Sequence, residues 1–111
     1  MSESFSLVVD RHHAFGVLAT LRIAAQPARR FTLQEAAIVA RALKAVAQGA
    51  SDERQIFMSP IASDHDFDAS VERDGVILRV EGCADARLNW PETLALAEQL
   101  ARASSEDFVG S

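Results

Sequence analysis

The dipeptide Asp74-Gly75, flanked on both sides by alternating apolar and polar residues, constrains the fold of this chain most strongly. Asp-Gly is a favoured loop of a two-residue β-hairpin, because both central residues of that turn adopt positive φ. We therefore predict a hairpin whose strands span residues 67–73 and 76–81. In this register Val71 faces Leu78.

The two faces of the predicted hairpin differ in polarity. One side carries only apolar residues, namely Phe67, Ala69, Val71, Val76, Leu78 and Val80. The other side carries Asp68, Ser70, Glu72, Arg79 and Glu81, with Ile77 as the only apolar residue. This alternation indicates one buried face and one solvated face. The same register places Asp68 opposite Glu81, which is a mildly unfavourable like-charge pair.

A capping box predicts where the first helix begins. Thr32 and Glu35 have the spacing at which each side chain satisfies a free amide of the first turn. Helix-forming residues continue to Gln48, and Gly49 is suited to a left-handed cap. Apolar residues cover most of the circumference of this helix, so we expect it to be covered on more than one side. In a chain this small, a partner subunit is a candidate for the second cover.

A second helix is predicted to start near Asn89, where Pro91 lies in the first turn and Glu92 completes the spacing of another capping box. An apolar stripe continues from residue 94 to residue 103. We expect the tail at residues 105–111 to fray.

The remaining elements give weaker signals, and no internal repeat is visible. Residues 4–10 and 55–59 read as short strands. Residues 14–24 fit either strand alternation or helical spacing, and their β-branched residues and Gly16 favour a strand. The predicted order is β-β-α-β-β-β-α. It implies a single α+β domain over residues 1–111, with a mostly antiparallel sheet of about four to five strands and two helices on one face.

Charge is unevenly distributed along the 111 residues. Sixteen acids and eleven bases give a formal charge of −5, which argues against duplex DNA or an anionic membrane as the main partner. Residues 1–50 carry six bases and three acids, a net of +3, whereas residues 51–111 carry five bases and thirteen acids, a net of −8. Many of these acids lie on the polar face of the hairpin or just before it. The residues predicted to bind a partner are Asp64, Asp66, Asp68, Glu72, Arg79 and Glu81.

Two arginines form a candidate anion site. Arg29 and Arg30 directly precede the first predicted helix. Two guanidinium groups beside a helix N-terminus have the chemistry to hold a phosphate or a carboxylate.

Metal and cofactor signals are weak, and we predict neither. The acids of residues 64–68 begin like a calcium-binding loop, but Ala69 and Gly75 occupy the positions of the required Gly and Glu. The single cysteine, Cys83, excludes an internal disulfide and is expected to be a small buried thiol. An alternative is a ligand-binding or metal-binding domain, or an enzyme, with a pocket between sheet and helices. It would use His12, His13 and His65 with Asp64 and Asp66.

The sequence carries no phosphate loop, nucleophile elbow or zinc-protease motif. We therefore expect a small soluble non-enzymatic protein that acts as a homodimer by binding another protein, through the acidic hairpin face, the apolar helix or both. Small acidic chaperones, immunity proteins and inhibitors share this profile of size and charge. A surface that imitates nucleic acid to block a basic protein is a further possibility. With no apolar run of membrane-spanning length and no signal-peptide pattern, the expected location is the cytoplasm.

Overall fold

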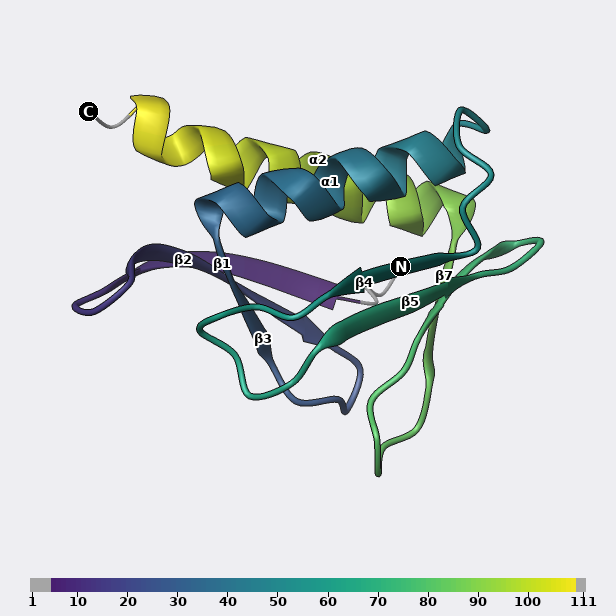
Figure 1. Cartoon of the computed structure of the whole chain (residues 1–111), viewed down its shortest axis with the longest axis horizontal. Helices are drawn as coiled ribbons and strands as arrows, with labels where there is room; N and C mark the ends of the chain where they lie inside the picture. The colour runs from purple at the N-terminus through teal and green to yellow at the C-terminus, as the bar shows by residue number, and fades with distance from the viewer. Residues whose placement is uncertain (1–4, 110–111) are drawn as a thin grey trace.

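The computed structural model describes residues 5–109, and side chains as far as Ser105. It confirms the α+β class: two helices lie side by side over two antiparallel sheets (Figure 1). The first sheet has the order β1 (Phe5–His12), β2 (Gly16–Ile23) and β3 (Arg29–Thr32). The second has the order β4 (Gln55–Met58), β5 (Phe67–Val71), β6 (Gly75–Leu78) and β7 (Ala86–Asn89). The helices are α1 (Leu33–Ala47) and α2 (Trp90–Val109).

The observed order, β-β-β-α-β-β-β-β-α, contains strands that we did not predict. The unpredicted strands are β3 and β7, each four residues long and each directly preceding a helix. Strand β3 begins with two consecutive arginines and β7 contains Arg87, so both lack the apolar run by which a short strand is recognised. Residues 16–23 are a strand, which resolves the ambiguity over residues 14–24.

The register of the central hairpin differs from the prediction by two residues. Val71 pairs with Val76, and the Glu72 amide donates to the Gly75 carbonyl at 2.7 Å, so the loop is Arg73-Asp74. Gly75 instead begins β6, where an added Cβ would overlap the carbonyl oxygen of Leu88 on β7. The glycine is therefore required by the close approach of two strands rather than by the turn itself.

A shift of two residues leaves the side chains of β5 and β6 on their predicted faces but changes their neighbours; β6 ends at Leu78, and Val80, predicted on the buried face, lines a hollow on the outer face. The Arg79 amide donates to the Asp68 carbonyl at 3.0 Å, so Asp68 lies opposite Arg79 and not opposite Glu81. The predicted like-charge pair is wrong, and an opposite-charge neighbour replaces it. Ile77 lies on the outer face as predicted, yet it is buried in the central strand.

The predicted starts of both helices are confirmed. In α1, the Glu35 amide donates to Thr32 Oγ1 at 3.1 Å and the Thr32 amide donates to Glu35 Oε1 at 2.9 Å. In α2, Asn89 and Glu92 exchange equivalent bonds, both at 2.8 Å. Helix α2 continues to Val109, into the tail at residues 105–111 for which we expect fraying, and residues 110–111 lie outside the described range. Neither helix, over the described residues, is long and apolar enough to cross a membrane.

Most of the wide apolar arc of α1 is covered within the chain, and Ile38 is the large apolar residue of α1 that stays exposed, at 43%. Its buried residues are Ala36, Val39, Ala40, Leu43 and Val46, and they belong to the same core cluster as Leu96, Ala97 and Leu100 of α2. One flank of α1 meets the sheets and the other meets α2 (Figure 1). The second cover that the structure shows is α2. The rings of Phe31 and Phe67, 5.8 Å apart, join the inner faces of the two sheets.

The structure reveals a repeat that residue identities do not show. Three antiparallel strands followed by a capped helix occur twice, and adding 57 to a residue number relates the two units over two strands and the helix. Thr32 corresponds to Asn89 at the cap, and the pair Leu18–Thr32 corresponds to Gly75–Asn89. The same offset converts the buried residues of α1 into the buried residues of α2, which are Thr93, Leu96, Ala97, Leu100 and Ala103. Strand β4 lies outside this repeat and extends the second sheet.

Candidate functional site

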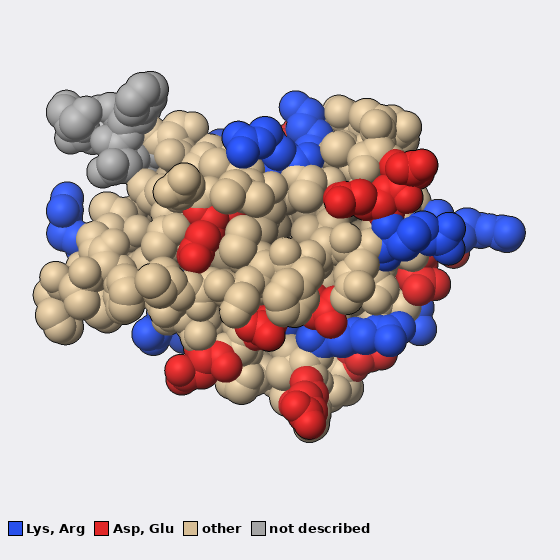
Figure 2. Space-filling model, viewed as in Figure 1, with Lys and Arg blue, Asp and Glu red and all other residues tan. Residues whose placement is uncertain are grey.

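An acidic hollow lies on the outer face of the second sheet, on the side away from the helices. Its volume is about 470 Å³, and its lining residues are Phe57, Asp64, His65, Asp66, Asp68, Arg79, Val80 and Glu81. The structure thus brings together all but one of the residues predicted to bind a partner. The exception, Glu72, lies at the β5–β6 turn beside Arg73 and Arg54, in a separate hollow of about 430 Å³. Acidic side chains gather over the lower half of the face shown in Figure 2.

Strand pairing fixes one wall of the acidic hollow. Phe57 on β4 pairs with Asp68 on β5, and Asp68 lies opposite Arg79, which directly follows β6. These three residues therefore form a row across the outer face, because directly opposite side chains of an antiparallel pair point the same way. The sequence analysis missed Phe57, whose side chain is 58% exposed. The sequence could have indicated Phe57 through Ile56: successive side chains of a strand point to opposite faces, so a buried Ile56 places Phe57 on the outer face.

The loop before β5 supplies the other wall and is held at several points. The Ile61 amide donates to Glu35 Oε2 at 3.1 Å, which ties the loop to the first turn of α1. The Asp66 carbonyl accepts a bond from Arg29 Nε at 2.9 Å, which ties it to β3. The loop that carries Asp64 and His65 is therefore anchored by both a helix and the first sheet.

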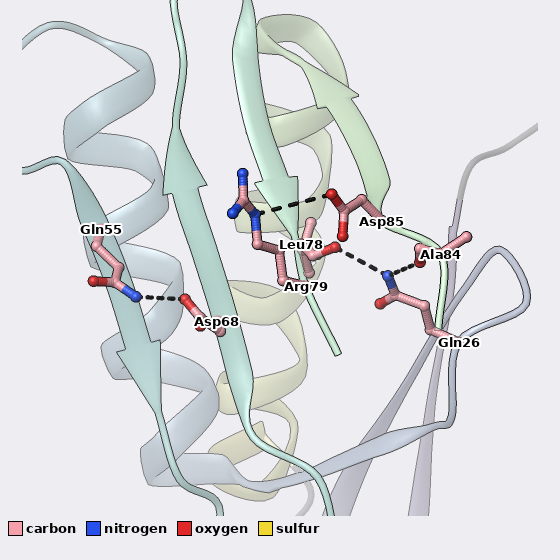
Figure 3. Close-up of polar contacts among 7 residues, drawn as sticks. All are labelled: Gln26, Gln55, Asp68, Leu78, Arg79, Ala84 and Asp85. Carbon is pink, nitrogen blue, oxygen red and sulfur yellow. Dashed lines mark hydrogen bonds and ion pairs between the residues drawn. The ribbon is translucent and has the colours of Figure 1, made fainter. Parts of the chain in front are cut away.

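Negative charge in the acidic hollow is only partly compensated. Gln55 Nε2 donates to Asp68 Oδ1 at 2.6 Å, and Arg79 Nε lies 4.0 Å from Asp85 Oδ2, outside the hollow (Figure 3). That contact is the single ion pair found among the described residues, and both of its side chains are about half exposed, so it contributes little stability. The hollow thus contains four carboxylates and one guanidinium, that of Arg79, which is also paired with a fifth carboxylate, that of Asp85. This arrangement attracts cations and cationic side chains.

A buried polar pair lies behind the acidic hollow. Arg29 is fully buried, and its Nη2 donates to Gln26 Oε1 at 2.8 Å. Gln26 Nε2 in turn donates to the carbonyls of Leu78 at 3.0 Å and Ala84 at 2.8 Å, as Figure 3 shows. Burial lowers the pKa of Arg29 below its usual value, and the nearby Asp68 carboxylate is among the groups that oppose this effect. Among the buried side-chain nitrogen and oxygen atoms of the described residues, Arg29 Nη1 alone has no hydrogen-bond partner.

The predicted anion site at Arg29 and Arg30 is not assembled. The two arginines are consecutive in β3, so their side chains point to opposite faces of the sheet. Arg29 enters the core, whereas Arg30 is exposed on the outer face of the first sheet. There it shares a hollow of about 290 Å³ with Arg11 and Arg22. The outer faces of the two sheets therefore carry opposite charge.

The histidines of the alternative hypothesis do not converge. His12 and His13 stack at 4.8 Å in the β1–β2 hairpin, and His12 Nδ1 accepts bonds from the amides of Ala14 at 3.0 Å and Phe15 at 3.3 Å. His65 lies in the acidic hollow of the other sheet. Within the part of the chain that the structure describes, no three His, Cys, Asp or Glu side chains are placed to hold a metal ion.

Cys83 is exposed in the β6–β7 loop, which corrects the expectation of a buried thiol. The loop is polar and leaves the sheet after β6, so it offers no apolar environment for the sulfur.

Compared with known proteins, the chain matches no protein-family model, no curated protein and no solved structure.

Proposed function

We propose that this chain is a non-enzymatic protein-binding module whose acidic hollow binds a basic segment of a partner protein. The observation that carries the proposal is the set of four carboxylates around one shared guanidinium, with the exposed ring of Phe57 at their edge. Lys and Arg side chains are complementary to this surface, because carboxylates pair with their charge and an aromatic face attracts a cation. A cytoplasmic location belongs to the same proposal.

Exposed apolar side chains favour a protein over a small ligand. Phe57 is 58% exposed, and Ile61, in the loop that leads to the acidic hollow, is 70% exposed. Exposed apolar residues beside a charged hollow are typical of a protein interaction surface. An acidic surface that imitates nucleic acid is a special case of this proposal, because its target is also a basic protein.

Two parts of the original hypothesis need different support. A homodimer through α1 loses most of its support, because α2 covers most of the apolar arc of that helix and leaves only Ile38 among its large apolar residues exposed. If the chain forms a dimer, we expect the contact to involve the surfaces of the sheets. The ligand-binding or metal-binding alternative keeps only His65 with Asp64 and Asp66. These three side chains are not placed to hold a metal ion together, so the alternative now predicts stabilisation against heat by a small molecule.

A charge-neutralised variant tests the proposal. Asp64→Asn, Asp66→Asn and Glu81→Gln together remove three charges from the acidic hollow. A matched control removes the same number elsewhere, with Asp10→Asn, Asp74→Asn and Glu98→Gln. The readout is the fluorescence anisotropy of a labelled peptide of about ten residues in which Lys and Val alternate.

We expect the hollow variant to bind this peptide about tenfold more weakly and the control variant to bind nearly as well as the wild type. Binding should also weaken as salt rises from about 50 mM to about 300 mM. An equal loss in both variants would show that net charge alone attracts the peptide, and it would contradict a specific site.

A further inference from the structure

We propose that the partner segment binds as an extended strand along the free edge of β4, with its basic side chains over Phe57 and the acidic hollow. This inference rests on the proposed function and specifies how the partner binds. It would make the bound segment a fifth strand of the second sheet, a mode of recognition in which main-chain hydrogen bonds supply affinity and side chains supply specificity.

The free edge of β4 offers main-chain groups of known direction. The Val71 amide donates to the carbonyl of Arg54, which lies directly opposite it. Because hydrogen-bonded and non-hydrogen-bonded pairs alternate along antiparallel strands, Ile56 also bonds toward β5. The N–H and C=O groups of Gln55 and Phe57 therefore point away from β5. No described strand pairs with this side, and β4 lies at the front of its sheet in Figure 1.

Strand β4 differs from the other edge strands in lacking charge. The edges of the two sheets are β1, β3, β4 and β7. Charged residues lie within three of them, namely Asp10 and Arg11 in β1, Arg29 and Arg30 in β3, and Arg87 in β7. Strand β4, Gln55–Met58, has none and contains no proline. Native proteins protect edge strands with charge, proline or short length; β4 has the four-residue length of β3 and β7 but not their charge, and its exposed Phe57 favours an edge that is paired in use.

Charge selects the occupant. Adjacent strands lie about 4.8 Å apart, so a Lys or Arg opposite Phe57 on an added strand lies beside the ring. Asp68 is one strand further, at about 10 Å, within reach of such a long side chain. A second copy fits less well, because its β4 contains no base and its own acidic hollow would approach with the same charge.

Proline substitutions test the main-chain part of this inference. Proline is tolerated on an edge strand where the N–H faces solvent, and the amides of Gln55 and Phe57 are not used by β5. Each proline variant is compared with its own alanine variant, Phe57→Pro with Phe57→Ala and Gln55→Pro with Gln55→Ala. Each pair loses the same side chain, so the difference within a pair reports the amide donor.

The alternating Lys-Val peptide is the probe, together with a version methylated on alternate backbone nitrogens. We expect each proline variant to bind the plain peptide about fivefold to tenfold more weakly than its alanine partner. The wild-type protein should bind the methylated peptide weakly, although its charge is unchanged. This second arm needs no folded variant, so it holds even if a proline unfolds the strand.

The outcomes separate the two proposals. If binding depends on the acidic hollow but is equal for proline and alanine variants and for both peptides, strand addition is overturned and the proposed function stands. If no hollow-dependent binding occurs, both are overturned. If light scattering shows a dimer that the proline variants dissociate, while the peptide is unaffected, the edge binds a second copy and the inference is overturned.

Discussion

Arg29 Nη2 donates a hydrogen bond of 2.8 Å to Gln26 Oε1, and both side chains are buried where the two sheets meet. Gln26 Nε2 in turn donates to the carbonyls of Leu78, at the end of β6, and of Ala84, in the β6–β7 loop. Arg29 Nε holds the carbonyl of Asp66, in the wall of the acidic hollow. Two side chains of the first unit thus fix the position of the second sheet and of its candidate site.

The first prediction concerns Gln26→Ala. The substitution removes the acceptor of a buried guanidinium and the donor to two carbonyls, so it should lower the free energy of unfolding by about 2–4 kcal/mol. Urea denaturation measures this loss. Arg30→Ala, one residue from Arg29 but exposed, is the control and should change stability by less than about 0.5 kcal/mol. A cost for Gln26→Ala as small as that of the control would show that water replaces these bonds.

The second prediction concerns the pH dependence of the Arg29 contribution. Burial lowers the pKa of Arg29 in the folded state, but an arginine remains charged at all ordinary pH values. A base with a lowered folded pKa carries a constant cost of burial below that pKa, and the cost is relieved only when strongly alkaline pH removes the proton. The difference in unfolding free energy between wild type and Arg29→Met should therefore be constant from about pH 5 to about pH 9. Urea titrations across this range measure it, and a difference that changes with pH would contradict this assignment.

Local signals predicted the parts of the fold that depend on neighbouring residues. The capping residues Thr32 and Glu35 identified the start of α1 because their hydrogen bonds span only one turn. Alternation assigned each side chain of the β5–β6 hairpin to the correct face. Its register differed from the prediction by two residues, and Gly75, expected in the turn, lies in β6 against the carbonyl of the distant residue Leu88. The sequence offered no sign of that contact.

The candidate site was predicted in composition but not in shape. Acidic residues from Asp64 to Glu81 were grouped because they are close in sequence, and the hairpin brings them together in space. Phe57 joined them only through the pairing of β4 with β5. Arg29 was predicted to share an anion site with Arg30, and its burial and its bonds to Gln26 and Asp66 were not visible in the sequence.

The third prediction concerns Gly75→Ala. A Cβ at this position would overlap the Leu88 carbonyl, and backbone atoms cannot move away as a flexible side chain can. The substitution should cost at least about 3 kcal/mol, measured by urea denaturation. Gly82→Ala is the control: φ is +83° and nothing lies within 4 Å, so only backbone strain of about 1 kcal/mol is expected. Equal costs would show that β6 and β7 separate without penalty.

The fourth prediction concerns the two oxygens of Glu35. Oε1 accepts the cap bond from Thr32, and Oε2 accepts the bond from the Ile61 amide. Thr32→Ala should cost about 1 kcal/mol through the cap alone, and Glu35→Ala about 1 kcal/mol more. Amide hydrogen exchange distinguishes the two variants, because the Ile61 amide should exchange faster in Glu35→Ala only. Faster exchange in both would mean that the helix end, rather than the carboxylate, holds the loop.

The fifth prediction concerns the thiol of Cys83, which is exposed on the loop next to Val80 and Glu81 of the acidic hollow. One thiol per chain should react with Ellman's reagent in native buffer, at a rate within about tenfold of the rate in urea, because no opening of the fold is needed. Cys83→Ser is the control and should not react. A thiol that reacts only after unfolding would restore the sequence-based expectation of burial. If the thiol reacts as expected, a fluorophore attached to Cys83 would report on a partner in the acidic hollow, because Cys83 lies beside the hollow and is not one of its lining residues.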